Sequence, residues 1–84
     1  MNSIFVQIKC DLGQAYQVAA QLADEFENAS QIYSTSGHWD LLVQFRLEDG
    51  LDPGLFVNEH LHRVPGIRDT YTIMVFDAFT PSGG

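Results

Sequence analysis

The residues whose types could support chemistry gather in one short segment, residues 33–40. Gly37 allows a tight turn whose backbone N–H groups stay open to a ligand carboxylate. The Asp40 carboxylate could receive an ammonium group, or it could instead fasten the turn through hydrogen bonds to the backbone. The segment therefore predicts either a site for a small zwitterion or a structural turn, and both interpretations stay open.

Four further side chains are candidates for the same site because they are close to Gly37 in sequence: Tyr33, Ser36, His38 and Trp39. Proximity is a weaker argument than chemistry, so they rank behind Gly37 and Asp40. For Trp39 we favour an aromatic of the core or of an interface, because indole buries a large apolar area.

A metal site and a reactive thiol are not expected. His60 and His62 are two residues apart on a predicted helix and point in different directions, and Glu59 with His62 at i, i+3 supplies only two ligands. Cys10, the one cysteine, lies in a predicted strand, and nothing nearby in sequence would lower its pKa. We interpret it as a small buried hydrophobe, and we predict no metal and no cofactor.

Hydrophobic periodicity predicts the elements that must position this segment. Alternating residues predict strands over residues 4–10, 30–35, 39–48 and 70–79, and 3.6-residue periodicity predicts helices over 14–28 and 53–63. Asp52 is the expected N-cap of the second helix, with Pro53 at its first position. The order βαββαβ is that of a ferredoxin-like α+β sandwich with both helices on one face of a four-stranded antiparallel sheet. Residues 1–79 form the predicted domain, and residues 80–84 a flexible tail.

The sheet face away from the helices is predicted to remain apolar. It should carry Phe5, Leu42, Met74 and Phe76, mixed with polar residues such as Gln7, Gln44, Arg46 and Thr72. Such a face is too apolar for open water, so we expect a second subunit to cover it in a two-fold dimer with facing sheets.

Charge and composition argue against nucleic acid and membranes as partners. Eleven acidic residues against four basic ones give a formal net charge of −7, which disfavours direct binding to nucleic acid or to an anionic membrane. No apolar run approaches the roughly 18 residues of a membrane span, and the start lacks a secretory signal. With a single cysteine, these features predict a cytoplasmic protein.

Two segments carry a family resemblance. Residues 33–43 (YSTSGHWDLLV) resemble the Gly-x-x-Asp hairpin of the Lrp/AsnC effector domain, also called the regulation-of-amino-acid-metabolism (RAM) domain. Residues 64–67 (VPGI), leading into 70–73 (TYTI), look like that family's second-helix exit and final strand. The resemblance covers about residues 4–79.

The resemblance implies an amino-acid effector bound near the hairpin, at the boundary between dimers of a ring-like homo-oligomer such as an octamer or decamer. The family's helix-turn-helix is absent ahead of the first predicted strand. The chain is therefore expected to be a stand-alone, non-enzymatic sensor that could modulate a full-length Lrp/AsnC transcription regulator by co-assembly.

Three other functions stay open. Dimeric α+β barrels of this strand order include cofactor-free monooxygenases and isomerases, and the nearest catalytic candidates here are His38, Trp39 and Asp40, with no second group recognisable by spacing. An ACT-type amino-acid-binding domain shares the topology, but the Gly-x-x-Asp hairpin favours the interpretation as an Lrp/AsnC domain. A scaffold without a ligand is the third.

Overall fold

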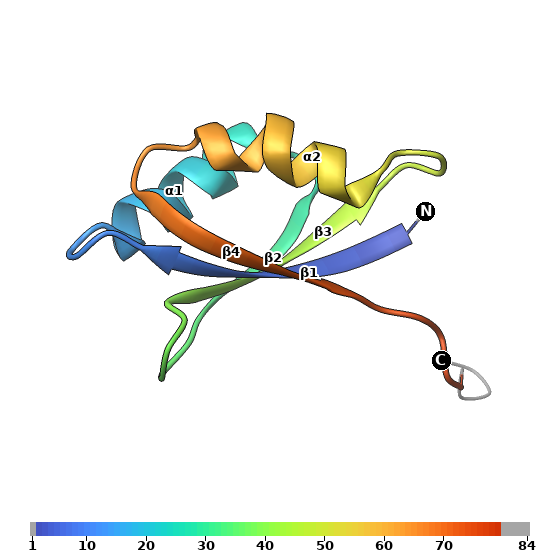
Figure 1. Cartoon of the computed structure of the whole chain (residues 1–84), viewed down its shortest axis with the longest axis horizontal. Helices are drawn as coiled ribbons and strands as arrows, with labels where there is room; N and C mark the ends of the chain where they lie inside the picture. The colour runs from blue at the N-terminus through green and yellow to red at the C-terminus, as the bar shows by residue number, and fades with distance from the viewer. Residues whose placement is uncertain (1, 80–84) are drawn as a thin grey trace.

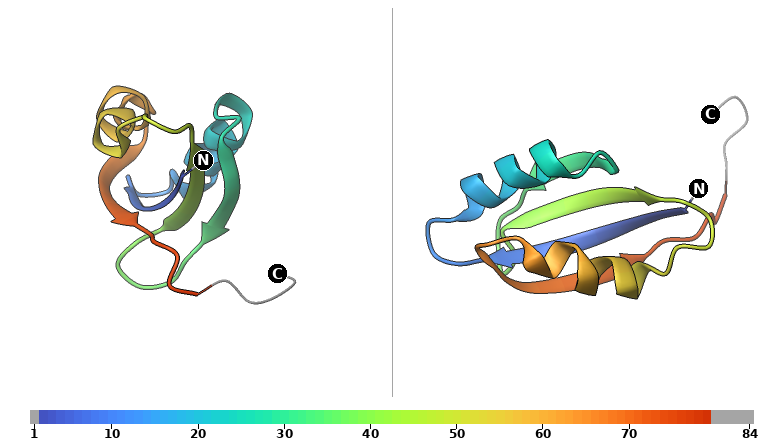
Figure 2. Two further views of the ribbon diagram at one scale, coloured as in Figure 1. Left: turned by 90° about the vertical axis from the view of Figure 1, so that its right-hand side faces the viewer. Right: turned by 90° about the horizontal axis from the view of Figure 1, so that it is seen from above.

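The chain forms a four-stranded antiparallel sheet with two helices packed on one face (Figures 1 and 2). The computed structural model describes residues 2–79. Its elements are β1 (Asn2–Cys10), α1 (Ala15–Glu25), β2 (Ala29–Ser34), β3 (Leu41–Leu47), α2 (Pro53–Glu59), the 3₁₀ turn η1 (Leu61–Arg63) and β4 (Ile67–Met74). The sheet order is β2-β3-β1-β4, so the predicted ferredoxin-like α+β sandwich is confirmed.

The core lies between the sheet and the helices. Strict alternation turns one side of β1 and β3 toward the helices, and the side chains buried there are Ile4, Val6, Ile8, Cys10, Leu41, Val43, Phe45 and Leu47. Val18 and Leu22 of α1 pack onto this layer, together with Phe56 and Val57 of α2. The buried faces of β1 and β3 were expected from the alternation of the sequence, because a strand buries every second residue.

Both helices are shorter than their periodicity predicts. The helix predicted over 14–28 ends at Glu25, where Phe26 adopts an extended backbone that leads into β2. Asp52 is the N-cap of α2, as expected, and its Oδ1 accepts the Gly54 N–H at 2.8 Å. The helix predicted to reach Arg63 ends as an α-helix at Glu59 and tightens into η1. Pro65 disfavours helical backbone at Val64, which is extended.

The final strand begins and ends earlier than predicted. We expected 70–79, but β4 starts at Ile67, directly after Gly66, and ends at Met74. Its partner β1 sets these limits, because Cys10 pairs with Ile67 and Ile4 pairs with Met74. The placement of Asp77 in the last strand is therefore wrong, and residues 75–79 continue outside the sheet. The predicted flexible tail, 80–84, falls outside the described residues.

The sheet face away from the helices, called here the open face, is a mixed apolar and polar surface. It carries Phe5 and Gln7 of β1, Leu42 and Gln44 of β3, and Tyr71 and Ile73 of β4, which are paired in register across the sheet. Assigning Met74 and Thr72 to this face is wrong, because they oppose Ile4 and Val6 and so share the helix side. Phe76 follows the end of β4. Within residues 2–79, no helix is long and apolar enough to cross a membrane.

Candidate functional site

The loop between β2 and β3, residues 35–40 (the hairpin loop), holds most of the predicted site. Gly37 has φ +93°, a left-handed backbone that L side chains rarely adopt. A Cβ built on Gly37 would meet no atom within 4 Å. Glycine is therefore required here by the backbone conformation and not by lack of space.

Asp40 fastens the hairpin loop to β1. Its Oδ2 accepts the Cys10 N–H at 2.8 Å, and its own N–H donates to the Ile8 carbonyl at 2.9 Å. The Thr35 N–H closes the base of the loop by donating to the Asp40 carbonyl at 3.0 Å. The Lys9 ammonium lies 3.9 Å from the same Oδ2. Of the two roles left open for Asp40, the structural one is thus present in this fold.

The tip of the hairpin loop presents unpaired amides. Over residues 2–79, the backbone N–H groups of Ser36, Gly37, His38 and Trp39 donate no hydrogen bond to the protein. Ser36, Gly37 and His38 are also exposed. A bound carboxylate can therefore replace water at these donors without breaking a protein hydrogen bond.

Aromatic rings flank the loop tip on the side of the open face. The Trp39 ring lies 5.1 Å from the His38 ring in an edge-to-face arrangement, and 6.3 Å from Tyr71 of β4, measured between ring centroids. Tyr33 lies on the open face opposite Leu42 and is half exposed, and no ring contact within the described residues joins it to Trp39. The loop thus brings His38 and Trp39 together and leaves Tyr33 apart.

Sequence reasoning missed Tyr71 and Lys9 as neighbours of this loop. Tyr71 pairs with Gln7 and Lys9 pairs with Asp69, so the four residues share one end of the open face. The alternation of β4 was the available signal. It was misapplied, because the even-numbered residues of the strand were assigned to the open face.

Cys10 is part of the core and is not a reactive group. Its side chain is buried, and burial raises the pKa of the thiol, with the carboxylates of Asp40 and Asp11 raising it further against the opposing effect of Lys9. The thiol therefore stays protonated at neutral pH. The interpretation of Cys10 as a small buried hydrophobe is confirmed.

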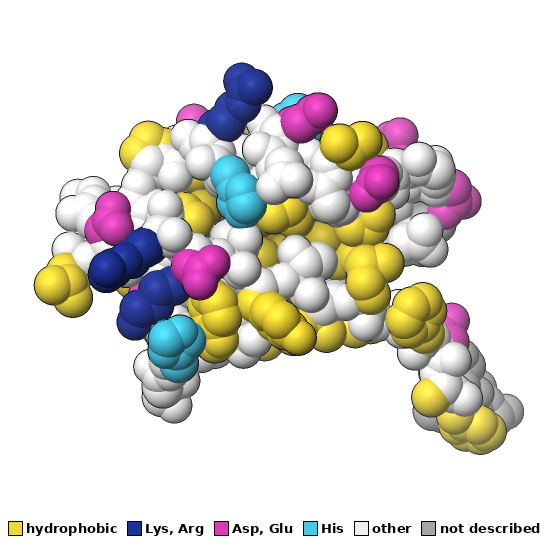
Figure 3. Space-filling model, viewed as in Figure 1, with side chains coloured by type: hydrophobic (Ala, Val, Ile, Leu, Met, Phe, Trp, Pro, Cys, Tyr) yellow, Lys and Arg dark blue, Asp and Glu magenta, His cyan; other side chains and the backbone are white. Residues whose placement is uncertain are grey.

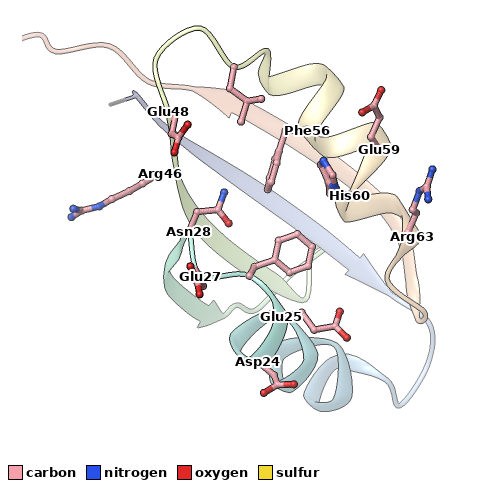
Figure 4. Close-up of a pocket in the computed structure, with 12 residues that line it drawn as sticks. Asp24, Glu25, Glu27, Asn28, Arg46, Glu48, Phe56, Glu59, His60 and Arg63 are labelled. Atoms are coloured by element: carbon pink, nitrogen blue, oxygen red, sulfur yellow. The ribbon is translucent and has the colours of Figure 1, made fainter.

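A separate hollow lies on the helix side of the sheet. It is an open groove of about 870 Å³ between the end of α1 and α2, and none of the six predicted site residues lines it. Phe56 points into it, and its ring lies 6.1 Å from the Phe26 ring and 5.8 Å from the His60 ring, measured between centroids (Figure 4). Exposed carboxylates, Asp24, Glu25 and Glu27 among them, form part of its rim. The predicted site is therefore no enclosed cavity in a single chain.

The two histidines of the second helical segment lie in different surroundings. His60 follows α2, whereas His62 lies in η1 with its Nε2 2.7 Å from Thr70 Oγ1. Across residues 2–79, no group of three or more His, Cys, Asp or Glu side chains is arranged to hold a metal ion.

The anchoring role of Asp40 can be measured directly. Asp40→Ala removes the acceptor of the Cys10 N–H, and we expect the free energy of unfolding to fall by about 1–2 kcal/mol, because the bond involves a charged group that is partly exposed. Lys9→Met removes only the ion pair and should cost less than about 1 kcal/mol. Urea unfolding measures the loss in unfolding free energy of each variant. Equal losses would contradict the anchoring role of Asp40.

Comparison with known proteins places this geometry in a family. The model of the Lrp/AsnC ligand binding domain matches residues 3–84. Among curated proteins, the chain is 28% identical over 71 residues to the HTH-type transcriptional regulator FL11 of Pyrococcus abyssi, covering 84% of this chain and 46% of that protein. A second regulator of that organism, uncharacterised, is 31% identical over 61 residues, which are 73% of this chain and 40% of the relative. The chain thus spans about half the length of the curated relatives it matches.

Solved structures share the fold at low sequence identity. FFRP-DM1 superposes with a TM-score of 0.82 at 22% identity, covering 90% of this chain and 100% of that one. A transcriptional regulator from Neisseria meningitidis, solved as a complex with L-methionine, has a TM-score of 0.79 at 17% identity, covering 96% of this chain and 53% of that one. AsnC of E. coli has a TM-score of 0.77 at 15% identity, covering 95% and 54%.

Proposed function

Because this chain belongs to the Lrp/AsnC ligand-binding domain family, we propose that it is a regulatory domain that senses an amino acid and catalyses no reaction. The observation that carries the proposal is the hairpin loop, a glycine turn with unpaired amides beside an anchored carboxylate. Relatives named as transcriptional regulators support a regulatory role, and the L-methionine complex of a structural neighbour supports an amino-acid ligand.

In this proposal the loop recognises both ends of a zwitterion. The effector's carboxylate accepts hydrogen bonds from the amides at Ser36–Trp39, and its ammonium group binds Asp40 at Oδ1, since Oδ2 is engaged by Cys10 and Lys9. The effector's side chain packs against His38 and Trp39, with Tyr33 at the margin of the site. A charge-assisted bond at each end selects α-amino acids over simple carboxylic acids or amines.

The same proposal requires a second copy of the chain. The loop tip lies outside any enclosed cavity of one chain, and the open face exposes Tyr33, Tyr71 and part of Phe5 to solvent. We place a facing sheet of a second copy on the open face, and we place the effector where dimers meet in a larger homo-oligomer. Co-assembly with a full-length Lrp/AsnC regulator in the cytoplasm is the route by which the domain would act on transcription.

Binding is tested by a thermal-shift screen with the twenty L-amino acids, followed by calorimetry on each hit. A ligand present at 100 times its Kd stabilises the folded state by about 2.7 kcal/mol, so a true effector should raise Tm by several degrees. Light scattering at the same concentrations reports whether the hit changes the assembly mass. The proposal fails if none of the twenty compounds shifts Tm.

Gly37 offers a sharper test with a matched control. Gly37→Ala strains the left-handed backbone that presents the amides, and we expect it to weaken effector binding at least about tenfold. Gly50 has φ +87° and likewise no atom within 4 Å of its built Cβ, but it lies in the β3–α2 turn. Gly50→Ala should therefore strain the chain similarly and leave affinity unchanged. Equal losses in both variants would remove the hairpin loop from the site.

A further inference from the structure

The groove on the helix side of the sheet combines an aromatic floor with an acidic rim. It runs between the end of α1 and α2 and has a volume of about 870 Å³. Phe26 and Phe56 form its floor, and Figure 4 shows both rings between the two helices. Leu51, in the turn before α2, lines the groove and is 43% exposed. The groove therefore offers apolar surface to a ligand of matching shape.

The rim of the groove carries more negative than positive charge. Five carboxylates line it: Asp24, Glu25, Glu27, Glu48 and Glu59. All five are exposed, and none of them forms an ion pair within residues 2–79. The two arginines of the rim are Arg46 and Arg63, and Figure 4 shows Arg46 extending away from the phenylalanine rings. Figure 3 shows acidic side chains gathered over α2 and the turn before it, whereas Lys and Arg lie mainly at the opposite end of that face.

Two of the rim carboxylates stand where helix electrostatics disfavour them. Glu25 is the last residue of α1 and Glu59 is the last residue of α2, and neither α-helix has a basic residue in its last turn. The C-terminal end of a helix carries partial negative charge, so a carboxylate there destabilises the fold unless a cation lies nearby. Within the described residues, Glu25 accepts only an exposed hydrogen bond from Gln21, at 3.2 Å. A bound cation would relieve this repulsion at both helix ends.

We propose that the groove docks a basic amphipathic peptide segment of a partner protein. An apolar side chain of the segment packs on Phe26 and Phe56, and its Lys or Arg side chains reach the carboxylates of the rim. Amphipathic helices bind apolar grooves in this way, with affinity from buried anchors and selectivity from complementary charge. The groove is open to solvent, which suits a peptide better than a small molecule, because small-molecule sites bury most of their ligand.

A second copy of this chain is a poor occupant of the groove. The formal net charge of each copy is −7, so two copies repel each other at an acidic surface. The most exposed phenylalanines, Phe76 and Phe79, lie beside Asp77, and no Lys or Arg follows Arg68 in the sequence. The groove is also separate from the hairpin loop and from the open face. The docking proposal therefore depends neither on the amino-acid site nor on the facing-sheet dimer.

Binding is tested with a labelled synthetic peptide of about 18 residues, in which leucine recurs at helical spacing and lysine fills the other positions. One control peptide has the same composition with the leucines spread around the helix, and another replaces every lysine with glutamate. Fluorescence anisotropy at about 0.15 M salt, where screening limits long-range attraction, gives each Kd. We expect the first peptide to have a Kd at least about tenfold lower than either control. Equal Kd values for the two lysine peptides, or no binding by the first, would overturn the proposal.

The variant Glu25→Gln/Glu59→Gln tests whether the peptide binds at the groove. It removes two charges from the helix ends, so we expect the peptide Kd to rise at least about tenfold while Tm stays at or above the wild-type value. Asp11→Asn/Asp77→Asn is the matched control, because it removes the same charge from two exposed carboxylates outside the groove. It should raise Kd less than about twofold. Equal increases in both variants would mean that net charge alone attracts the peptide, and would overturn the assignment of the groove.

The apolar part of the contact is tested by Leu51→Ser. We expect this change to raise the peptide Kd about threefold, because it removes a partly exposed apolar side chain that the docked segment covers. Leu12→Ser is the matched control, since Leu12 is 94% exposed in the β1–α1 loop, outside the groove, and it should leave Kd unchanged. A Leu51→Ser Kd equal to that of the wild type would show that the segment does not pack in the groove, and would overturn the proposal.

Discussion

Replacing Phe45 with alanine is expected to lower the free energy of unfolding by about 3–5 kcal/mol. The side chain is fully buried in β3, and its ring packs edge-on against Phe26 at 5.9 Å and Phe56 at 5.1 Å. Removing it leaves a cavity between the sheet and both helices and removes the ring contacts of Phe45 with Phe26 and Phe56. A domain of this size has a small stability margin, so the variant should be partly unfolded at 37 °C.

Urea unfolding followed by circular dichroism measures this loss, at protein concentrations low enough that assembly does not contribute. Tyr16→Ala is a suitable control, because its side chain is exposed on α1 and its removal should change stability by less than about 0.5 kcal/mol. A Phe45→Ala loss as small as that of the control would show that the core does not depend on this ring.

The second large effect is expected at the turn that leads into β4. Gly66 has φ +94°, and a Cβ there would lie 2.9 Å from Val18 Cγ2 and 3.3 Å from Gln14 Cβ. Gly66→Ala must therefore both strain the backbone and push α1 away from the turn. We expect a loss of about 2–4 kcal/mol in the free energy of unfolding.

Gly37→Ala separates these two causes. Gly37 has nearly the same φ, +93°, but no atom within 4 Å of its built Cβ, so its loss should reflect backbone strain alone, about 1–2 kcal/mol. The difference between the two variants then measures the contact with α1. Equal losses in urea unfolding would show that α1 yields freely to the added methyl group.

The turn at Gly66 also explains why the start of the last strand was predicted too late. The Asp11 N–H donates to the Gly66 carbonyl at 2.8 Å, which joins the end of β1 to the start of β4. β4 therefore begins at Ile67, directly after the turn, although residues 70–79 have the stronger β-forming composition. Local propensity located a strand near here, but a pairing partner was needed to delimit it.

The role of Asp40 depended on tertiary contacts in the same way. Sequence placed a carboxylate three residues after Gly37 and left two functions open for it. The structural role depends on the Cys10 N–H, which is 30 residues away and reaches Asp40 because β1 pairs with β3. Tyr71 likewise lies beside Trp39 because β4 pairs with β1, so that contact also depends on strand pairing.

The amino-acid sequence by itself determined the element types, the βαββαβ order, the buried faces of β1 and β3 and the glycine turn of the hairpin loop. These depend on periodicity and backbone chemistry within a few neighbouring residues. Only the tertiary structure decided where β4 ends, which of its residues face away from the helices, and that residues 75–79 form an arm outside the sheet. Those features depend on the register between distant strands, and register is set by the packing of the whole sheet against its helices.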